Sequence, residues 1–270
     1  TPSGEEEDSE ESDWKNSPMF IESVRHAQRV AGEALWLSTR TRPDLCYPIQ
    51  KMTSLATKNP EKATAIGTRI LRYLKGTKDL GLMYLNREET AKKYEEMKMD
   101  WPKEVCEEER VVVWTDSSFA SQERQKSQGA LVVTQSLSPV FWKCGTQSLI
   151  ALSTAESELQ MLCEGSLAAQ NIGLLLKEVS KVPDEVKERK ETIEDLEKRT
   201  EFNDESFQAE EDDLEELLCI DNKAATQILT QESGSWRTRH LRVRAESLKQ
   251  RIEEGRQQVV HIPGRSMIAD

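Results

Sequence analysis

The sequence has no long hydrophobic run, and this absence excludes several classes of protein. No apolar stretch approaches the ~20 residues that a membrane-spanning helix requires, so we expect no membrane partner. The first residues, Thr-Pro-Ser-Gly-Glu-Glu-Glu-Asp, lack the apolar core of a secretory signal. They also lack an initiator methionine, so we expect a fragment or a processed product.

Cysteine and histidine are scarce and scattered. None of the five cysteines belongs to a Cys-x-x-Cys pair, which disfavours both a disulfide framework and a zinc site. The five are Cys46, Cys106, Cys144, Cys163 and Cys219. The three histidines, His26, His240 and His261, are equally dispersed. This usage is typical of reduced thiols in an intracellular protein.

The net charge of -12 by itself disfavours nucleic-acid binding, but the negative charge is concentrated in two segments. Residues 1–13 carry seven acids and no base, and residues 182–217 carry sixteen acids and five bases. Subtracting -7 and -11 from the total leaves +6 on the rest of the chain, which is compatible with phosphate contact. We interpret residues 1–16 as a disordered acidic tail and residues 182–217 as an acidic insertion.

Apolar periodicity predicts helices in the first third of the chain. The pattern covers residues 18–57, with a break at Arg42-Pro43-Asp44 because the residue before proline avoids helical backbone. Another helix opens at Asn59-Pro60 and ends at Lys75-Gly76. This last helix carries a basic residue at every third position, namely Arg69, Arg72 and Lys75. We interpret this row either as a solvated helix face or as a surface for a nucleic-acid backbone.

The second half of the chain has the pattern of an α/β domain. It follows a polar, charged stretch at residues 86–109, which we interpret as a linker. Short runs rich in β-branched residues predict strands at 111–114, 130–133, 140–142, 217–220 and 259–262. Apolar periodicity and capping residues predict helices at 153–180, 222–229 and 237–253. This order predicts a mixed sheet, in which a meander of three strands is followed by crossovers.

Two acidic residues come after two of these predicted strands. Asp116 follows the strand at 111–114, and Asp221 follows the strand at 217–220. Two carboxylates brought together need a cation between them, and oxygen ligands suit Mg²⁺. Two such ions about 4 Å apart can activate water and stabilise the leaving oxygen in phosphodiester cleavage. Aspartate after a strand is also a common turn or N-cap residue, so the residue types alone leave a structural role open.

Five stretches, in order along the chain, match one family pattern. The first is Leu-Trp-Leu-Ser-Thr-Arg-Thr-Arg-Pro-Asp-Leu at 35–45. The second is Arg-Ile-Leu-Arg-Tyr-Leu-Lys-Gly-Thr at 69–77 with Gly-Leu-Met-Tyr at 81–84. The third is Trp-Thr-Asp-Ser-Ser-Phe-Ala at 114–120. The fourth is Phe-Trp-Lys at 141–143 with Gln147, then Ala-Leu-Ser-Thr-Ala-Glu-Ser-Glu-Leu at 151–159. The fifth combines Asp-Asn-Lys-Ala-Ala at 221–225, Arg-Thr-Arg-His-Leu at 237–241, Ile-Pro-Gly at 262–264 and Ala-Asp at 269–270.

Together these stretches resemble the copia-type retrotransposon Pol polyprotein, from the end of the reverse transcriptase through the ribonuclease H domain. The resemblance implies a ribonuclease H-like fold, with a five-stranded mixed sheet and flanking helices, preceded by a small helical segment. It implies that residues 17–85 are the thumb-like or connection-like helical end of reverse transcriptase, and that residues 110–270 form the nuclease domain. The family's metal ligands carry over to Asp116, Glu158, Asp221 and Asp270, with Glu156 as the alternative to Glu158.

The implied reaction is endonucleolytic hydrolysis of the RNA strand of an RNA–DNA hybrid during reverse transcription, with two Mg²⁺ ions or Mn²⁺ in their place. The implied partners are the hybrid and the polymerase part of Pol, in a cytoplasmic virus-like particle or the nucleus. Candidate contacts to the nucleic acid, besides the basic row at 69–75, are Arg237, Arg239, His240, Arg242 and Arg244. His240 and His261 are also candidates for a proton-shuttling role; we interpret His261, on the last predicted strand, as structural.

The chain also departs from the family pattern. Ser118 and Phe119 replace the usual Asp and Trp, the acidic insertion is long, and no Tyr-x-Asp-Asp polymerase motif occurs. The helix expected after Asp270 is absent from the sequence. These departures support an alternative, in which the chain is a catalytically inactive retrotransposon remnant that at most binds nucleic acid. A purely structural protein, the third hypothesis, would leave the four acids far apart.

Overall fold

The computed structural model describes residues 15–99, 101–102, 105, 110–120, 126–180, 216–230 and 242–269. The chain divides into two compact units, one formed by Thr1–Met83 with Trp142–Thr146 and the other by Tyr84–Phe141 with Gln147–Asp270. The assignment of these units to a polymerase end and a nuclease stays a prediction. In the described part of the chain, the helices are all too short or too polar to cross a membrane.

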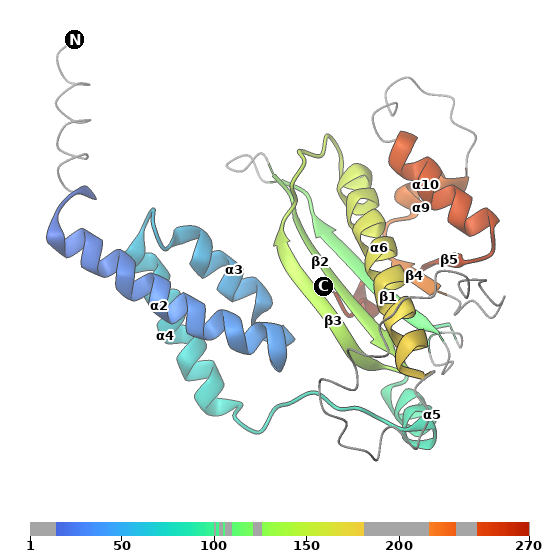
Figure 1. Cartoon of the computed structure of the whole chain (residues 1–270), viewed down its shortest axis with the longest axis horizontal. Coiled ribbons are helices and arrows are strands. Elements are labelled where there is room, and N and C mark those ends of the chain that lie inside the picture. The colour runs from blue at the N-terminus through green and yellow to red at the C-terminus, as the bar shows by residue number, and fades with distance from the viewer. Residues whose placement is uncertain are drawn as a thin grey trace, which may run out of the picture. The chain divides into compact units, whose positions relative to one another are not determined.

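The first unit is built from helices whose ends follow the capping residues of the sequence. They are α2 (Pro18–Arg40), α3 (Cys46–Leu55) and α4 (Pro60–Gly76), with the short 3-10 helix η1 (Pro43–Leu45) between the first two (Figure 1). Ser17 accepts a hydrogen bond from the N–H of Phe20 at 3.2 Å, and Asn59 accepts one from the N–H of Lys62 at 2.9 Å. Both α2 and α4 have proline at the first position, where its missing N–H costs nothing because that group has no partner within the helix. The predicted helices and the break between them are therefore present.

The break after α2 is held by a buried arginine. The Nε and Nη2 groups of Arg42 donate to the two carboxylate oxygens of Asp44, at 2.9 and 2.7 Å. Its Nη1 group donates to the main-chain carbonyl of Thr77 at 3.0 Å, and the guanidinium lies 5.4 Å from the ring centre of Tyr73. The Thr-Arg-Pro-Asp run therefore joins the end of α2 to the end of α4.

The second unit contains a five-stranded mixed sheet, except that the last five residues of its third strand are grouped with the first unit. Its strands are β1 (Val111–Ser118), β2 (Gln128–Gln135), β3 (Ser138–Thr146), β4 (Glu216–Ile220) and β5 (Gln257–His261), in the order β3-β2-β1-β4-β5. β1 pairs antiparallel with β2 and parallel with β4, and β4 pairs parallel with β5. A two-residue turn joins β2 to β3, which requires these strands to be antiparallel. The predicted ribonuclease H-like sheet with flanking helices is confirmed.

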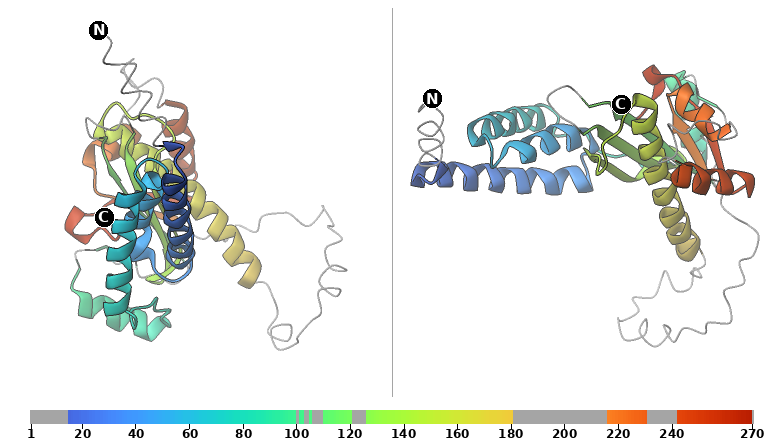
Figure 2. Two further views of the ribbon diagram at one scale, coloured as in Figure 1. Left: turned by 90° about the vertical axis from the view of Figure 1, so that its left-hand side faces the viewer. Right: turned by 90° about the horizontal axis from the view of Figure 1, so that it is seen from above.

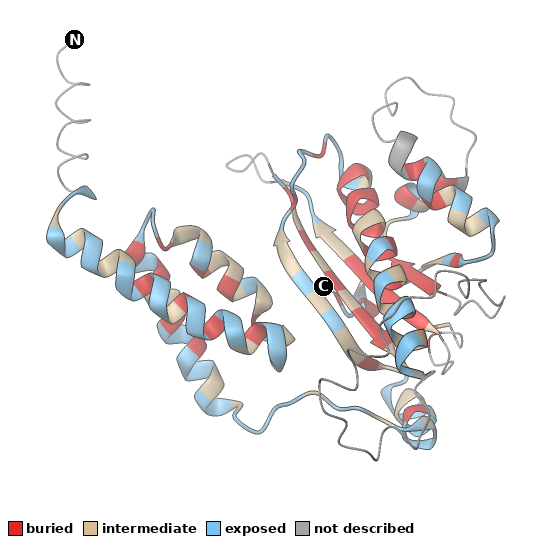
Figure 3. Cartoon of the chain, in the orientation of Figure 1, coloured by how far each residue is buried: buried red, intermediate tan, exposed pale blue. Residues whose placement is uncertain are grey.

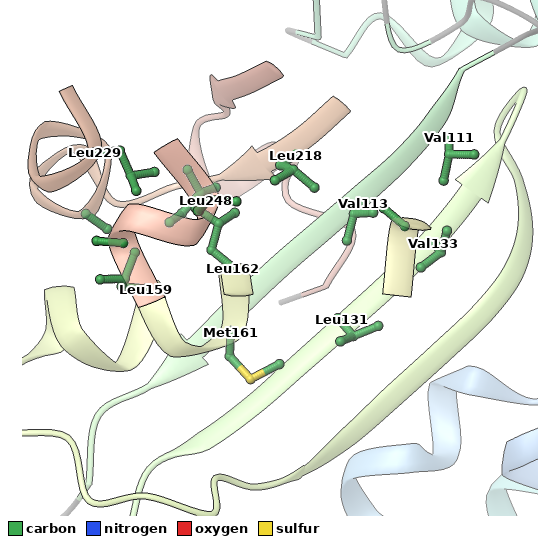
Figure 4. Packing of buried hydrophobic residues seen from close by; sticks show 14 residues of the cluster. Val111, Val113, Leu131, Val133, Leu159, Met161, Leu162, Leu218, Leu229 and Leu248 are labelled. Carbon is green, nitrogen blue, oxygen red and sulfur yellow. The ribbon is translucent and has the colours of Figure 1, made fainter. Parts of the chain in front are cut away.

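One face of the sheet is covered by helices α6 (Thr154–Ser180), α9 (Lys223–Thr230) and α10 (Arg242–Glu253). Val111 and Val113 of β1 belong to the same buried cluster as Leu159 and Leu162 of α6, which fills the space between this face and the helices (Figure 4). Gly165 lets α6 approach β1, because a Cβ there would lie 2.8 Å from Thr115 Cγ2. This close packing fixes the height of α6 above the sheet.

The described residues that cover the opposite face of the sheet come mostly from irregular chain, together with Tyr94 of helix α5 (Arg87–Met97). Val112 and Trp114, which alternate with the residues above, pack with Trp101, Ile262 and Met267. Figure 3 shows the central strands coloured largely as buried, whereas the edge strand β3 is mostly intermediate or exposed. The Trp101 ring centre lies 5.0 Å from that of Trp114, and its indole N–H donates to the carbonyl of Ser266 at 2.7 Å. The central strands are therefore buried on both faces.

The stretch at 86–109, predicted as a linker, belongs to the second unit. Its described part contains helix α5 (Arg87–Met97), whose capping box pairs Asn86 with Glu89. It also contributes Trp101 to the second face of the sheet. The sequence predicted a plain linker here because its few apolar anchors, among them Tyr94, Trp101 and Val105, form no periodic pattern in a polar stretch. Similarly, β4 begins at Glu216, so the last two residues of the acidic segment 182–217 belong to the sheet.

Candidate active site

Asp116 and Asp221 are neighbours because β1 and β4 run parallel. Their register pairs Thr115 with Ile220, and an aspartate follows each of these residues. Asp221 comes directly after β4, as predicted. Asp116 was predicted to follow its strand but lies within it, because pairing of Asp116 with Ala130 of β2 extends β1 to Ser118. The two carboxylates thus share one edge of the parallel pair.

Glu158 brings a third carboxylate to the same place from α6. One oxygen from each of Asp116, Glu158 and Asp221 lies within 4.8 Å of the other two. Glu158 is buried, whereas the two aspartates are partly exposed. Its Oε1 accepts a hydrogen bond from the main-chain N–H of Ser117 at 3.0 Å. Its Oε2 is buried and has no hydrogen-bond partner among the described residues.

The surroundings of Glu158 favour its neutral form. Burial raises the pKa of Glu158 to about 8, and the negative charges of Asp116 and Asp221 add to this rise. Hydrogen bonding from Ser117 acts against it. Three carboxylates with one unpaired buried oxygen form a donor set that suits a hard divalent cation, whose charge would favour the ionised Glu158.

The neighbouring acid on α6, Glu156, has a different role. Its Oε2 accepts a hydrogen bond from the N–H of Leu152 at 2.7 Å, and its own N–H donates to Ser153 Oγ at 3.2 Å. These contacts cap the start of the helix. Of the two candidates in the Ala-Glu-Ser-Glu run, Glu158 is the one that reaches the carboxylate cluster.

The chain after β5 packs against Asp221. His261 Nε2 lies 3.0 Å from the main-chain carbonyl of Asp221, and because a carbonyl can only accept, the ring donates from this nitrogen. A Cβ on Gly264, in the 3-10 helix η5 (Gly264–Ser266), would lie 3.3 Å from Asp221 Oδ2. These contacts agree with a structural role for His261. The importance of Gly264 was missed, although Pro263-Gly264 is a recognisable turn signal.

The structure describes only some of the other candidate residues. Arg237, Arg239, His240 and Asp270 lie outside the described residues. Arg242 and Arg244 belong to the first turn of α10, and their side chains also lie outside the described part. The basic row on α4 lies in the first unit, and its three side chains are exposed, with no ion-pair partner within the described ranges. We call this row, Arg69, Arg72 and Lys75, the α4 basic stripe.

Comparisons with known proteins return ribonuclease H structures at low identity. No family model matches the chain. Ribonuclease H1 from the halophilic archaeon Halobacterium salinarum NRC-1 is 16% identical, with a TM-score of 0.35 over 58% of this chain and 87% of that chain. The N-terminal RNase H domain of a Mycobacterium tuberculosis protein, solved as a maltose-binding-protein fusion, is 14% identical, with a TM-score of 0.36 over 60% and 88%. LC11-RNase H1, isolated from compost by a metagenomic approach, is 12% identical, with a TM-score of 0.33 over 58% and 86%. We base the assignment of the fold on the order and directions of the strands described above, and not on these structural superpositions.

Proposed function

We propose that this chain hydrolyses the RNA strand of RNA–DNA hybrids endonucleolytically, as part of retrotransposon reverse transcription. The observation that carries the proposal is the convergence of Asp116, Glu158 and Asp221, which come from β1, α6 and the end of β4. Their oxygens lie close enough to share a cation, and three acids are otherwise costly to hold together. The resemblance to copia-type Pol supports the same assignment.

The proposed cofactor is a pair of Mg²⁺ ions, with Mn²⁺ as a substitute. Asp116, Glu158 and Asp221 would hold them, and we propose Asp270 as a fourth ligand. Bound divalent ions supply charge that activates water and stabilises the leaving oxygen of a phosphodiester. The protein contributes orientation: Ser117 fixes one oxygen of Glu158, and His261 fixes the main chain at Asp221.

Hybrid binding is proposed to use basic surfaces outside the cluster. The α4 basic stripe is exposed and offers three cations on one helix, which suits contact with a phosphate backbone. We propose the same role for Arg237, Arg239, His240, Arg242 and Arg244. The further partner is the polymerase part of Pol, in a cytoplasmic virus-like particle or in the nucleus.

The test is cleavage of a labelled RNA–DNA hybrid by purified protein extended past Asp270. With Mg²⁺ the protein should cut the RNA strand and leave 3′-hydroxyl ends, whereas Asp116→Asn should lower the rate by a factor of at least about 100. A wild type no faster than Asp116→Asn would reject the nuclease function. Binding of the hybrid without turnover would instead support the inactive remnant.

A further inference from the structure

Gln147 is a buried glutamine in the connection between β3 and α6. Its side chain is almost fully buried, with 3% of the residue exposed. Its main-chain N–H donates to the carbonyl of Ser127 at 2.8 Å, and Ser127 immediately precedes β2. Gln147 is therefore fixed to the same end of the sheet at which β2 begins. The fourth family-like stretch includes this residue, yet neither the fold nor the proposed chemistry has given it a role.

The side-chain amide of Gln147 makes a two-point contact with one residue of α6. Its Nε2 donates to the main-chain carbonyl of Ser157 at 2.8 Å, and the Ser157 hydroxyl donates to its Oε1 at 3.2 Å. Ser157 is completely buried. Because the carbonyl can only accept, the amide has one orientation that satisfies both bonds. A planar group held at both ends fixes the rotation of the first turn of α6.

Ser157 is followed by Glu158, so this contact holds the main chain next to Glu158, one of the three clustered acids. The tip of that carboxylate is held separately by the N–H of Ser117 at 3.0 Å. The pairing of β1 with β4 ends at Thr115 and Ile220, so Ser117 lies beyond the paired region. Its N–H donates to Glu158 instead of to a residue of β4. A small rotation of the helix turn would withdraw Glu158 from both Ser117 and the two aspartates.

We propose that Gln147 is a positioning residue, which sets the rotation of the first turn of α6 so that Glu158 reaches Asp116 and Asp221. The inference deepens the proposed function, and it rests on that function only for its Mn²⁺-affinity readout. The geometry it describes is measurable without any substrate or cation.

The chain provides a matched control on the same helix. Gln257 of β5 contacts Ser166 in the same two-point manner: Ser166 Oγ donates to Gln257 Oε1 at 2.8 Å, and Gln257 Nε2 donates to the Ser166 carbonyl at 3.3 Å. Gln257 is also 3% exposed. Its contact lies about two and a half turns further along α6, away from Glu158. Gln257→Leu therefore removes a buried amide with a comparable two-point contact to α6, together with its hydrogen bond to Glu216, without acting on the first turn.

The experiment compares Gln147→Leu with Gln257→Leu by amide hydrogen exchange in EDTA. Exchange at Ser117 should be at least about 10-fold faster in Gln147→Leu than in wild type, and unchanged in Gln257→Leu after normalisation to core amides of β1. Mn²⁺ affinity, measured by calorimetry, should weaken by about 10- to 100-fold in Gln147→Leu alone. Ser157→Ala, which keeps the carbonyl contact and removes only the hydroxyl, should give a smaller change in the same direction.

Unchanged exchange at Ser117 in Gln147→Leu would overturn the proposal, as would equal acceleration in both leucine variants. If Gln147→Leu does not fold, Ser157→Ala decides the question by the same measurement. Should wild-type protein cleave no hybrid, the nuclease function fails, but the exchange result still settles whether Gln147 positions Glu158.

Discussion

Replacing Glu158 by glutamine should stabilise the protein at neutral pH when no divalent cation is bound. Glutamine has nearly the same shape and keeps an oxygen that can accept the N–H of Ser117. It cannot ionise, so burial and the charges of Asp116 and Asp221 no longer act against it. Its NH₂ group also offers donors to the neighbouring carboxylates.

The magnitude follows from the pKa of Glu158, which burial raises from 4.5 to about 8. Below pH 4.5 this carboxyl is protonated in both the folded and the unfolded state. Between pH 4.5 and about 8 the unfolded state releases a proton that the folded state keeps, so the free energy of unfolding falls by about 1.4 kcal/mol per pH unit. At pH 7 the wild type should therefore have lost roughly 3 kcal/mol that Glu158→Gln retains, and the loss should level off above pH 8.

Urea unfolding followed by circular dichroism, in EDTA and between pH 5 and pH 8.5, measures this difference. Glu178→Gln, at an exposed position near the end of α6, is the charge-matched control and should follow the wild type. Saturating Mg²⁺ should stabilise the wild type more than Glu158→Gln, because the variant lacks one proposed ligand. The same pH dependence for wild type and Glu158→Gln in EDTA would refute the reasoning.

Three further predictions concern packing and binding. Arg42→Ala removes the double hydrogen bond to Asp44 and should lower the free energy of unfolding by about 3 kcal/mol, with Arg42→Lys recovering only part of it; a decrease below about 1 kcal/mol in urea unfolding would contradict this. Gly165→Ala places a Cβ 2.8 Å from a β1 side chain and should cost about 1–3 kcal/mol. Gly173→Ala, whose nearest neighbour would be 3.4 Å away, should be neutral or stabilising by up to about 1 kcal/mol; equal melting temperatures for these two variants would disprove the packing argument. Replacing the three residues of the α4 basic stripe with glutamine should weaken hybrid binding. The slope of log binding constant against log salt concentration should become shallower by about 0.9 for each phosphate that the stripe neutralises. Fluorescence anisotropy measures this slope, and an unchanged slope would mean that the stripe does not contact the hybrid.

The sheet was predictable because its central strands carry a strong local signal. Strands buried on both faces appear as continuous apolar runs, and Val111–Trp114 and Leu217–Ile220 are such runs. The extension of β1 to Ser118 was not predictable, because polar residues there are ordered by pairing with β2. Trp101 gave no signal for a similar reason, since its partner Ser266 is distant in sequence.

The site was predictable at its two aspartates and ambiguous at its glutamate. The residue pattern placed Asp116 and Asp221 after two predicted strands, and the family resemblance implied that they meet; the parallel pairing of β1 with β4 brings them side by side. Glu156 and Glu158 are two residues apart, which on a helix puts them on nearly opposite sides, so only the direction of α6 distinguishes them. That direction depends on glycine packing and on buried amides, neither of which has a recognisable sequence pattern.

The place where the acidic insertion joins the fold has a practical consequence. The segment departs at Ser180, the last residue of α6, and rejoins at Glu216, the first residue of β4. Ser180 is about 33 Å from Glu158 along the helix axis, and Glu216 is about 16 Å from Asp221 along the strand. Figure 2 shows the last turns of α6 extending away from the sheet. The segment between Ser180 and Glu216 is therefore a place where one sequence can be exchanged for another, by evolution or by design, without changing the spacing of Asp116, Glu158 and Asp221.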